Sequence, residues 1–371
     1  MAVIIAGQRV IDADGDRTGA WLRIDGGVIA EIGAGDAPDG AVKGAIVLPG
    51  FVDLHCHGGG GGSFTSAEAD QIETAIATHL AHGTTTMHAS LVSAEYDDLI
   101  AQIQALIPFV DSGAVAGIHL EGPWISRSYC GAHDPATLRT PETVDVQRVL
   151  DAGAGRISMV TIAPELPGAL GAIEMIVERG AIAAVGHTAA DGDVTRAAID
   201  SGATVATHVF NAMPPLLHRD IGPVGVLLAD PRVTCEVIAD GVHLDPDVVA
   251  LTLAAASGRG ALVTDAMSAA GAGDGNYRVG SLDVVVRDGV ARLRDGDSLA
   301  GSTLLMDSAW RRAVGLADRS PSEASAAASL APARAMGLTD RGRIAVGQRA
   351  DLVVLDEELQ AVRVMRAGEW V

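Results

Sequence analysis

The sequence predicts an α/β protein: a (β/α)8 TIM-like barrel with a small discontinuous β-sandwich domain built from both termini. Three observations support this prediction. Eight short apolar segments alternate with helical stretches through the middle of the chain. Both ends of the chain contain short alternating strands instead. Side chains that commonly bind metals recur directly after the apolar segments, where barrel enzymes carry their active sites.

The two ends of the chain share one pattern. Residues 1–50 contain short alternating runs separated by glycine and aspartate, and residues 342–371 repeat this texture. Neither end is large enough to bury a core alone, so we expect them to pair. The predicted β domain comprises residues 1–50 and 338–371, which leaves residues 51–337 for the barrel.

The barrel prediction depends on eight near-continuous apolar runs, because strands buried on both faces lack polar alternation. The expected strands are 45–54, 84–91, 115–121, 157–163, 181–187, 203–209, 233–239 and 261–265. Helical stretches between them include 67–81, 96–109, 170–179, 194–200 and 248–256. A doubly wound open sheet is the alternative, but no Gly-x-Gly-x-x-Gly follows the first strand. We interpret Tyr277 to Leu293 as a hairpin inserted after the eighth strand.

Composition limits the possible partners. The net charge of −21 disfavours nucleic acid and anionic membranes. Three scattered cysteines, no secretory leader and no membrane-length apolar stretch indicate a cytoplasmic protein. Lys43 is the only lysine and precedes the first barrel strand, which argues against Schiff-base chemistry and a lysine-bridged metal centre.

Ligand-type side chains follow the predicted strands. His55 and His57 end the first strand and face the same way, because side chains alternate along a strand. Four more strands end in such residues: Glu121, His187, His208 and Asp265. We predict that His55, His57, Glu121, His187 and His208 bind a divalent metal, of which zinc, iron, cobalt and manganese suit imidazole and carboxylate ligands.

Asp265 stands alone at the end of the eighth strand and is the candidate for proton transfer. The predicted chemistry is therefore metal-assisted hydrolysis of an amide or similar bond. His119 shares a face with Glu121 but lies deeper, so ligation and a supporting role stay equally open. His79 and His82 lie near a helix end and are interpreted as solvated or capping residues.

Several segments resemble those of the amidohydrolase superfamily and, within it, the N-acetylglucosamine-6-phosphate deacetylase family. They are Pro49-Gly-Phe-Val-Asp-Leu-His-Cys-His-Gly58, His119-Leu-Glu-Gly-Pro123 and His208-Val-Phe-Asn-Ala-Met-Pro214, with shorter matches around His187, Asp240 and Asp265. The resemblance implies a metal-dependent hydrolase that converts N-acetylglucosamine 6-phosphate to glucosamine 6-phosphate and acetate, in amino-sugar catabolism or cell-wall recycling.

The resemblance also implies roles for individual residues. Glu121, His187 and His208 would hold the main metal. His55 and His57 would hold a second one, which Glu121 would bridge, so one or two ions per subunit are expected. Asp265 would be the general base and acid, and His133 would polarise the acetyl carbonyl. The implied substrate-binding residues are Ala132, His133, Asn211, Ala212, Arg219, His243, Leu299, Ala300 and Gly301. The family further implies a homodimer in which Arg219 and His243 reach the neighbouring active site.

Two alternatives stay open and one is disfavoured. The chain is also compatible with a deacetylase of another N-acetyl sugar phosphate, and with a non-catalytic amidohydrolase-like binding protein, although such a relative should have lost ligands or the acid/base residue. Dihydroorotases and hydantoinases resemble it less, because they carry a bridging lysine after the fourth strand. Here that strand ends Thr161-Ile-Ala-Pro-Glu165.

Overall fold

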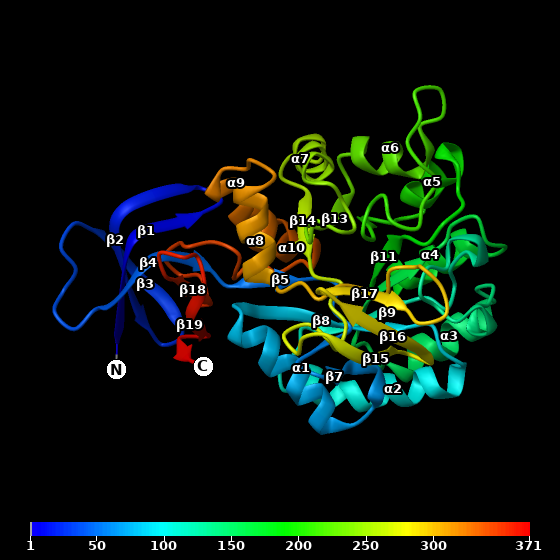
Figure 1. Ribbon diagram of the computed structural model, residues 1–371, viewed down its shortest axis with the longest axis horizontal. Helices are drawn as coiled ribbons and strands as arrows, with labels where there is room; N and C mark the ends of the chain where they lie inside the picture. The colour runs from blue at the N-terminus through cyan, green and yellow to red at the C-terminus, as the bar shows by residue number, and fades with distance from the viewer. Residues whose placement is uncertain (1) are drawn as a thin grey trace.

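The computed structural model describes residues 2–371, which form a β domain beside a larger barrel, with both chain ends in the β domain (Figure 1). The β domain is one seven-stranded sheet in the order β20-β19-β18-β4-β1-β2-β3. Its strands are β1 (Val3–Asp12), β2 (Gly15–Asp25), β3 (Val28–Ala34), β4 (Val42–Pro49), β18 (Leu352–Leu355), β19 (Ala361–Arg366) and β20 (Glu369–Trp370).

Strand β4 joins the two ends of the chain. It pairs with β1 in parallel and with β18 in antiparallel orientation. The sheet curls, since the backbone N–H of Ile29 in β3 donates to the carbonyl of Gln348, shortly before β18. Its concave side encloses a core that includes Ile5, Leu22, Ile29, Leu352 and Met365. The predicted union of both ends in one small β domain is confirmed.

The larger part is an eight-stranded parallel sheet. Its strands are β5 (Phe51–Asp53), β8 (Thr84–Val92), β9 (Gly117–Glu121), β10 (Ile157–Ile162), β11 (Ile182–Val185), β12 (Val205–Ala206), β13 (Thr234–Ile238) and β14 (Gly260–Val263). The sheet closes beyond β14 and β5, where the N–H of Asp265 donates to the carbonyl of His55 at 2.8 Å. Next to this contact, the backbones of Cys56 and Ala266 pair in an isolated parallel β-bridge. The predicted (β/α)8 barrel is confirmed.

Helices surround the barrel (Figure 1). They are α1 (Ala69–Ala81), α2 (Tyr96–Asp111), α3 (Thr143–Ala152), α4 (Ala169–Glu178), α5 (Gly192–Asp200), α6 (Gly222–Ala229), α7 (Pro246–Ala255), α8 (Met306–Gly315), α9 (Pro321–Ser325) and α10 (Ala331–Ala335). The Asp245-Pro246 pair begins α7, with the Asp245 carboxylate accepting from the N–H of Asp247 at 2.9 Å. Among residues 2–371, no helix combines the length and apolar character needed to cross a bilayer.

Two insertions shape the mouth of the barrel. The segment expected as a hairpin is a three-stranded antiparallel sheet of β15 (Gly275–Val279), β16 (Leu282–Arg287) and β17 (Val290–Leu293), and its core contacts Val92 and Met267 at the mouth. The glycine run forms a tight hairpin of β6 (Gly58–Gly59) and β7 (Gly62–Ser63) against α1. A Cβ at Gly62 would lie 2.2 Å from the backbone carbonyl oxygen of Gln71 in α1, so only glycine fits there.

Candidate active site

The strand ends bring the predicted ligands to one point at the mouth of the barrel. His55 and His57 follow β5, Glu121 ends β9, and His187, His208 and Asp265 follow β11, β12 and β14. His187, His208 and Asp265 have positive φ angles of 46°, 28° and 47°. In this left-handed conformation the backbone leaves the strand direction at the very residue that carries the functional side chain.

Glu121 lies at the centre of two groups of imidazoles. Its Oε1 is 3.0 Å from Nε2 of His187 and 3.0 Å from Nε2 of His208, and these two nitrogens are 3.0 Å apart. Its Oε2 is 3.2 Å from Nε2 of His57 and 3.5 Å from Nε2 of His55, which are themselves 3.0 Å apart. One carboxylate therefore serves both groups.

The donor atoms fit divalent cations. Nδ1 of His187 donates to the carbonyl of Tyr129 at 2.7 Å, and Nδ1 of His57 donates to the carbonyl of Ser90 at 3.1 Å. Because a carbonyl only accepts, each Nδ1 carries a proton, so Nε2 is the nitrogen that can present a lone pair toward Glu121. Burial lowers the pKa of His57, but without a metal the hydrogen bonds of Asp265 and Glu121 outweigh burial and raise it to about 9, so a cation would displace the Nε2 proton of this ring. Lone pairs about 3 Å apart repel unless a cation lies between them, and ligands 2.0–2.1 Å from zinc have roughly this spacing.

Asp265 belongs to the second group. Its Oδ1 is 3.3 Å from Nε2 of His57 and 3.5 Å from Nε2 of His55. Burial opposes its ionisation, but His55 and His57 outweigh burial and lower the pKa of Asp265 to about 2. Burial also opposes ionisation of Glu121, yet the surrounding imidazoles hold its pKa well below the usual range. Both carboxylates are thus ionised at neutral pH.

His133 and His119 have different environments. The backbone N–H of Ser93 donates to Nδ1 of His133 at 3.2 Å, which leaves the proton on Nε2, 3.2 Å from Glu121 Oε2. Burial lowers the pKa of His133 to about 4, so the ring is a neutral N–H donor. His119 bonds the hydroxyls of Ser90 at 2.9 Å and Thr161 at 2.8 Å with its two nitrogens. This favours the supporting role for His119, because neither nitrogen is free.

A cavity of about 350 Å³ opens above these groups. The predicted site residues that line it are His57, Glu121, Ala132, His133, His187, His208, Asn211, Ala212, His243, Asp265, Leu299 and Gly301. His55 lies beneath it, and Ala300 is buried behind Gly301. Arg219 is not part of the lining: it is exposed in the loop before α6, with no side-chain hydrogen bond or ion pair to residues 2–371.

His243 lines the cavity of its own chain, although the family resemblance placed it in the neighbouring site. Its Nδ1 lies 2.7 Å from Asp240 Oδ2. Burial lowers the pKa of His243, but the hydrogen bond and charge of Asp240 outweigh burial and raise it. His243 is therefore more readily protonated than a free histidine and lies at the edge of the cavity.

Sequence reasoning missed Glu236, which is fully buried in β13. Its Oε2 accepts from Nδ1 of His55 and from the backbone N–H of His208, both at 3.1 Å. The available signal was a single carboxylate inside the apolar run Thr234–Ile238.

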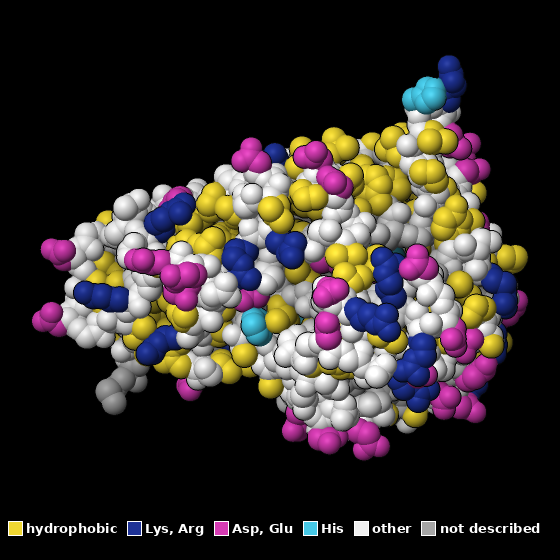
Figure 2. Space-filling model, viewed as in Figure 1, with side chains coloured by type: hydrophobic (Ala, Val, Ile, Leu, Met, Phe, Trp, Pro, Cys, Tyr) yellow, Lys and Arg dark blue, Asp and Glu magenta, His cyan; other side chains and the backbone are white. Residues whose placement is uncertain are grey.

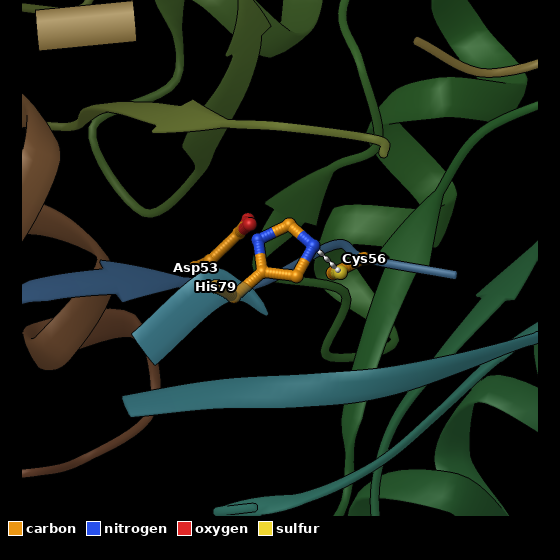
Figure 3. A group of neighbouring side chains, drawn as sticks. All are labelled: Asp53, Cys56 and His79. Carbon is orange, nitrogen blue, oxygen red and sulfur yellow. Dashed lines mark hydrogen bonds between the residues drawn. The ribbon is translucent and has the colours of Figure 1, made fainter. Parts of the chain in front are cut away.

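A second cluster of ligand-type residues, Asp53, Cys56 and His79, lies behind β5 (Figure 3). The interpretation of His79 as solvated or capping was wrong, because its side chain is buried. Its Nε2 is 2.9 Å from the carbonyl of Gly58 and 3.1 Å from Cys56 Sγ, so this nitrogen donates a proton. The oxygens of Asp53 accept from Thr264 and His55. These bonds tie β5 to its neighbours, and among the ligand-type atoms of this cluster only Nδ1 of His79 has no hydrogen-bond partner within residues 2–371.

Comparisons with known proteins agree with this geometry. The amidohydrolase family model matches residues 46–371. An N-acetylgalactosamine-6-phosphate deacetylase from Escherichia coli O157:H7 is 34% identical, over 100% of this chain and 99% of the relative. The Bos taurus N-acetylglucosamine-6-phosphate deacetylase is 36% identical, over 88% and 84%.

Among solved structures, a mutant N-acetyl-D-glucosamine-6-phosphate deacetylase from Mycobacterium smegmatis in complex with N-acetyl-D-glucosamine-6-phosphate is 47% identical, with a TM-score of 0.96 over 100% of this chain and 99% of that one. The chain therefore belongs to the amidohydrolase family and, within it, to the N-acetylglucosamine-6-phosphate deacetylases.

Proposed function

We propose that this enzyme hydrolyses the acetamide bond of N-acetylglucosamine 6-phosphate. Water is added, the bond between the acetyl carbon and the sugar nitrogen breaks, and acetate and glucosamine 6-phosphate are released. The observation that carries the proposal is the Glu121 carboxylate, which joins two imidazole groups beneath an open cavity with Asp265 beside it. The 47% identity to a deacetylase structure that holds this substrate supports it.

Two sets of residues would hold the cations. Glu121, His187 and His208 would bind one, and His55 and His57 would bind the other with Glu121 between them. Zinc suits this set of imidazole and carboxylate donors. When bound, a divalent cation polarises the acetyl carbonyl and lowers the pKa of water toward neutrality.

Asp265 would move the protons. Its ionised Oδ1 takes a proton from the attacking water and delivers it to the sugar nitrogen as the amide bond breaks. Asp265 is ionised at neutral pH, because His55 and His57 outweigh burial and lower its pKa to about 2. The nitrogen then leaves as a neutral amine instead of an anion.

His133 would stabilise the charge that develops on the acetyl oxygen. The Ser93 backbone N–H keeps the ring proton on Nε2, which lies 3.2 Å from Glu121 Oε2 in the wall of the cavity. A fixed donor of this kind is already oriented before the charge develops, which is why such groups strengthen catalysis.

The remaining lining residues would bind the sugar phosphate. Asn211 donates its amide to the carbonyl of His208 at 3.2 Å, which orients its oxygen for a sugar hydroxyl. Ala132, Ala212, Leu299, Ala300 and Gly301 would shape the wall. The phosphate needs cationic partners, and His243 supplies one from within the chain.

We further propose a homodimer in which Arg219 reaches the partner's cavity. Hydrophobic side chains around the loop before α6 are exposed, namely Leu216 (47%), Leu217 (54%), Ile221 (41%) and Val242 (41%). Figure 2 shows hydrophobic surface gathered over α6 and α7. A self-complementary contact there would cover these side chains and direct Arg219 toward the neighbouring phosphate.

Mixing two impaired variants tests this arrangement, with substrate kept well below the KM of R219A so that each variant alone has little activity. R219A chains lack the phosphate contact and D265N chains lack the base. If Arg219 acts across the dimer, mixed dimers contain one intact site, and random exchange restores about a quarter of wild-type activity. If Arg219 acts within its own chain, mixing restores nothing.

N-acetylgalactosamine 6-phosphate is a second candidate substrate, because the Escherichia coli relative named for it aligns over the whole chain. Acetate release measured with both sugar phosphates decides between them. We expect the higher kcat/KM for the gluco epimer, and a higher value for the galacto epimer would reverse the assignment.

We also propose a cytoplasmic location, supported by three unpaired cysteines. For the domains, we propose boundaries at residue 50, between β4 and β5, and at about residue 338, after α10.

A further inference from the structure

Glu236 is a buried carboxylate that the proposed chemistry does not use. It lies within β13 and is fully inaccessible to solvent. No arginine or lysine within residues 2–371 contacts it; its partners are Nδ1 of His55 and the backbone N–H of His208. A carboxyl group in an apolar interior is costly unless hydrogen bonds satisfy it, so the position of Glu236 needs a reason.

We propose that Glu236 is a positioning residue that holds His55 for the second cation and thereby sets a two-cation centre. This inference rests on the proposed metal centre. The Nδ1–H of His55 donates to Glu236, so Nε2 carries the lone pair and faces His57 and Glu121 Oε2. A carboxylate behind a ligating histidine also increases the basicity of the ring, which strengthens its bond to a metal.

The other imidazoles show why His55 depends on a side chain. His57 and His187 donate to the backbone carbonyls of Ser90 and Tyr129, which no substitution removes. His55 alone among the proposed ligands has a side-chain carboxylate behind it. Its orientation and its electron donation are therefore the ones that a mutation can alter.

Two substitutions separate geometry from charge. In Glu236→Gln the amide oxygen can still accept from His55 and His208, and the amide nitrogen would take the place of Oε1, which has no partner within residues 2–371. In Glu236→Ala the acceptor oxygen is lost, and with it the hydrogen bonds from His55 and His208. Asp307→Asn is the matched control. Asp307 lies in α8, is also buried, and its Oδ2 is 3.0 Å from Nδ1 of a histidine, His82.

The experiment titrates metal-free protein with zinc against a competing chelator and measures stoichiometry and affinity for each step. We expect wild type and D307N to bind two ions. E236Q should bind the second ion roughly 10–100-fold more weakly, and E236A should retain only the first. Circular dichroism checks that each variant is folded, and if E236A does not fold, E236Q decides alone.

The proposal is overturned if a folded variant binds the second ion with wild-type affinity, or if E236A loses both ions to the same degree. A wild-type protein that binds a single ion would instead reject the two-cation centre itself. Acetate release by wild type is measured separately, so failure of the deacetylase assignment is distinguishable from both results.

Discussion

Replacing Asp265 with asparagine probes the reaction most sharply. Asparagine has nearly the same shape, so its oxygen can keep the position 3.3 Å from His57 Nε2 and 3.5 Å from His55 Nε2. The amide cannot accept a proton at neutral pH, whereas the wild-type carboxylate, with a pKa of about 2, is fully ionised there. The perturbation therefore removes the base and leaves the cavity intact.

Loss of general base and acid catalysis should lower kcat by about 10²–10⁴-fold, equivalent to about 3–5 kcal/mol of barrier, while KM stays within about threefold of wild type. The assay measures initial rates of acetate release and, in the same preparations, bound metal. D307N serves as the folding control. A kcat close to wild type in D265N, with metal bound, would remove Asp265 from its proposed role, and loss of metal would make it a ligand instead.

Four further outcomes follow from the same geometry. R219A should raise KM about 10–100-fold with a smaller change in kcat, since a charged hydrogen bond to phosphate contributes binding; an unchanged KM rejects that contact. H57A should lower zinc content from two ions to one, and retention of two would place the second ion elsewhere. H133A should lower kcat about 10²–10³-fold, because one oriented donor to the acetyl oxygen is lost; a change confined to KM would argue against it. Native protein should expose one thiol to an aromatic disulfide reagent at pH 8, because Cys130 is partly accessible, whereas Cys56 and Cys235 are buried. Burial also raises the pKa of Cys235 to about 12 and the pKa of Cys56 well above its usual value, and more than one reacting thiol would contradict this.

Sequence patterns predicted the fold because both of its parts have strong periodic signals. The eight barrel strands are buried on both faces, so they appear as apolar runs, and the ends of the chain show the alternation of a half-buried sheet. The lengths of the individual strands were less predictable. The run expected at 203–209 is a strand only at Val205–Ala206, because the backbone turns away at His208, Phe210 and Ala212, all with positive φ. The local sequence does not predict positive φ angles at residues other than glycine here.

The metal-ligating residues were predictable because they end strands. The groups that orient these residues were not predictable, because they are backbone atoms or come from other strands. His55, His57, Glu121, His187 and His208 converge as expected, because parallel strands share one carboxyl edge. The Ser93 N–H that selects the tautomer of His133 and the carbonyls behind His57 and His187 are backbone groups, which no side-chain pattern encodes. Glu236 was visible as an acid within an apolar strand, but only the barrel closure brings it 3.1 Å from His55.

The most direct test of the metal-centred deacetylase is acetate release from N-acetylglucosamine 6-phosphate by the purified chain, before metal removal, after removal with a chelator, and after zinc is restored. We predict release by the initial protein, its loss with the metal, and its return with zinc. Undiminished release by metal-free protein, or no release by protein with two zinc ions bound, would contradict the role assigned to the Glu121 centre.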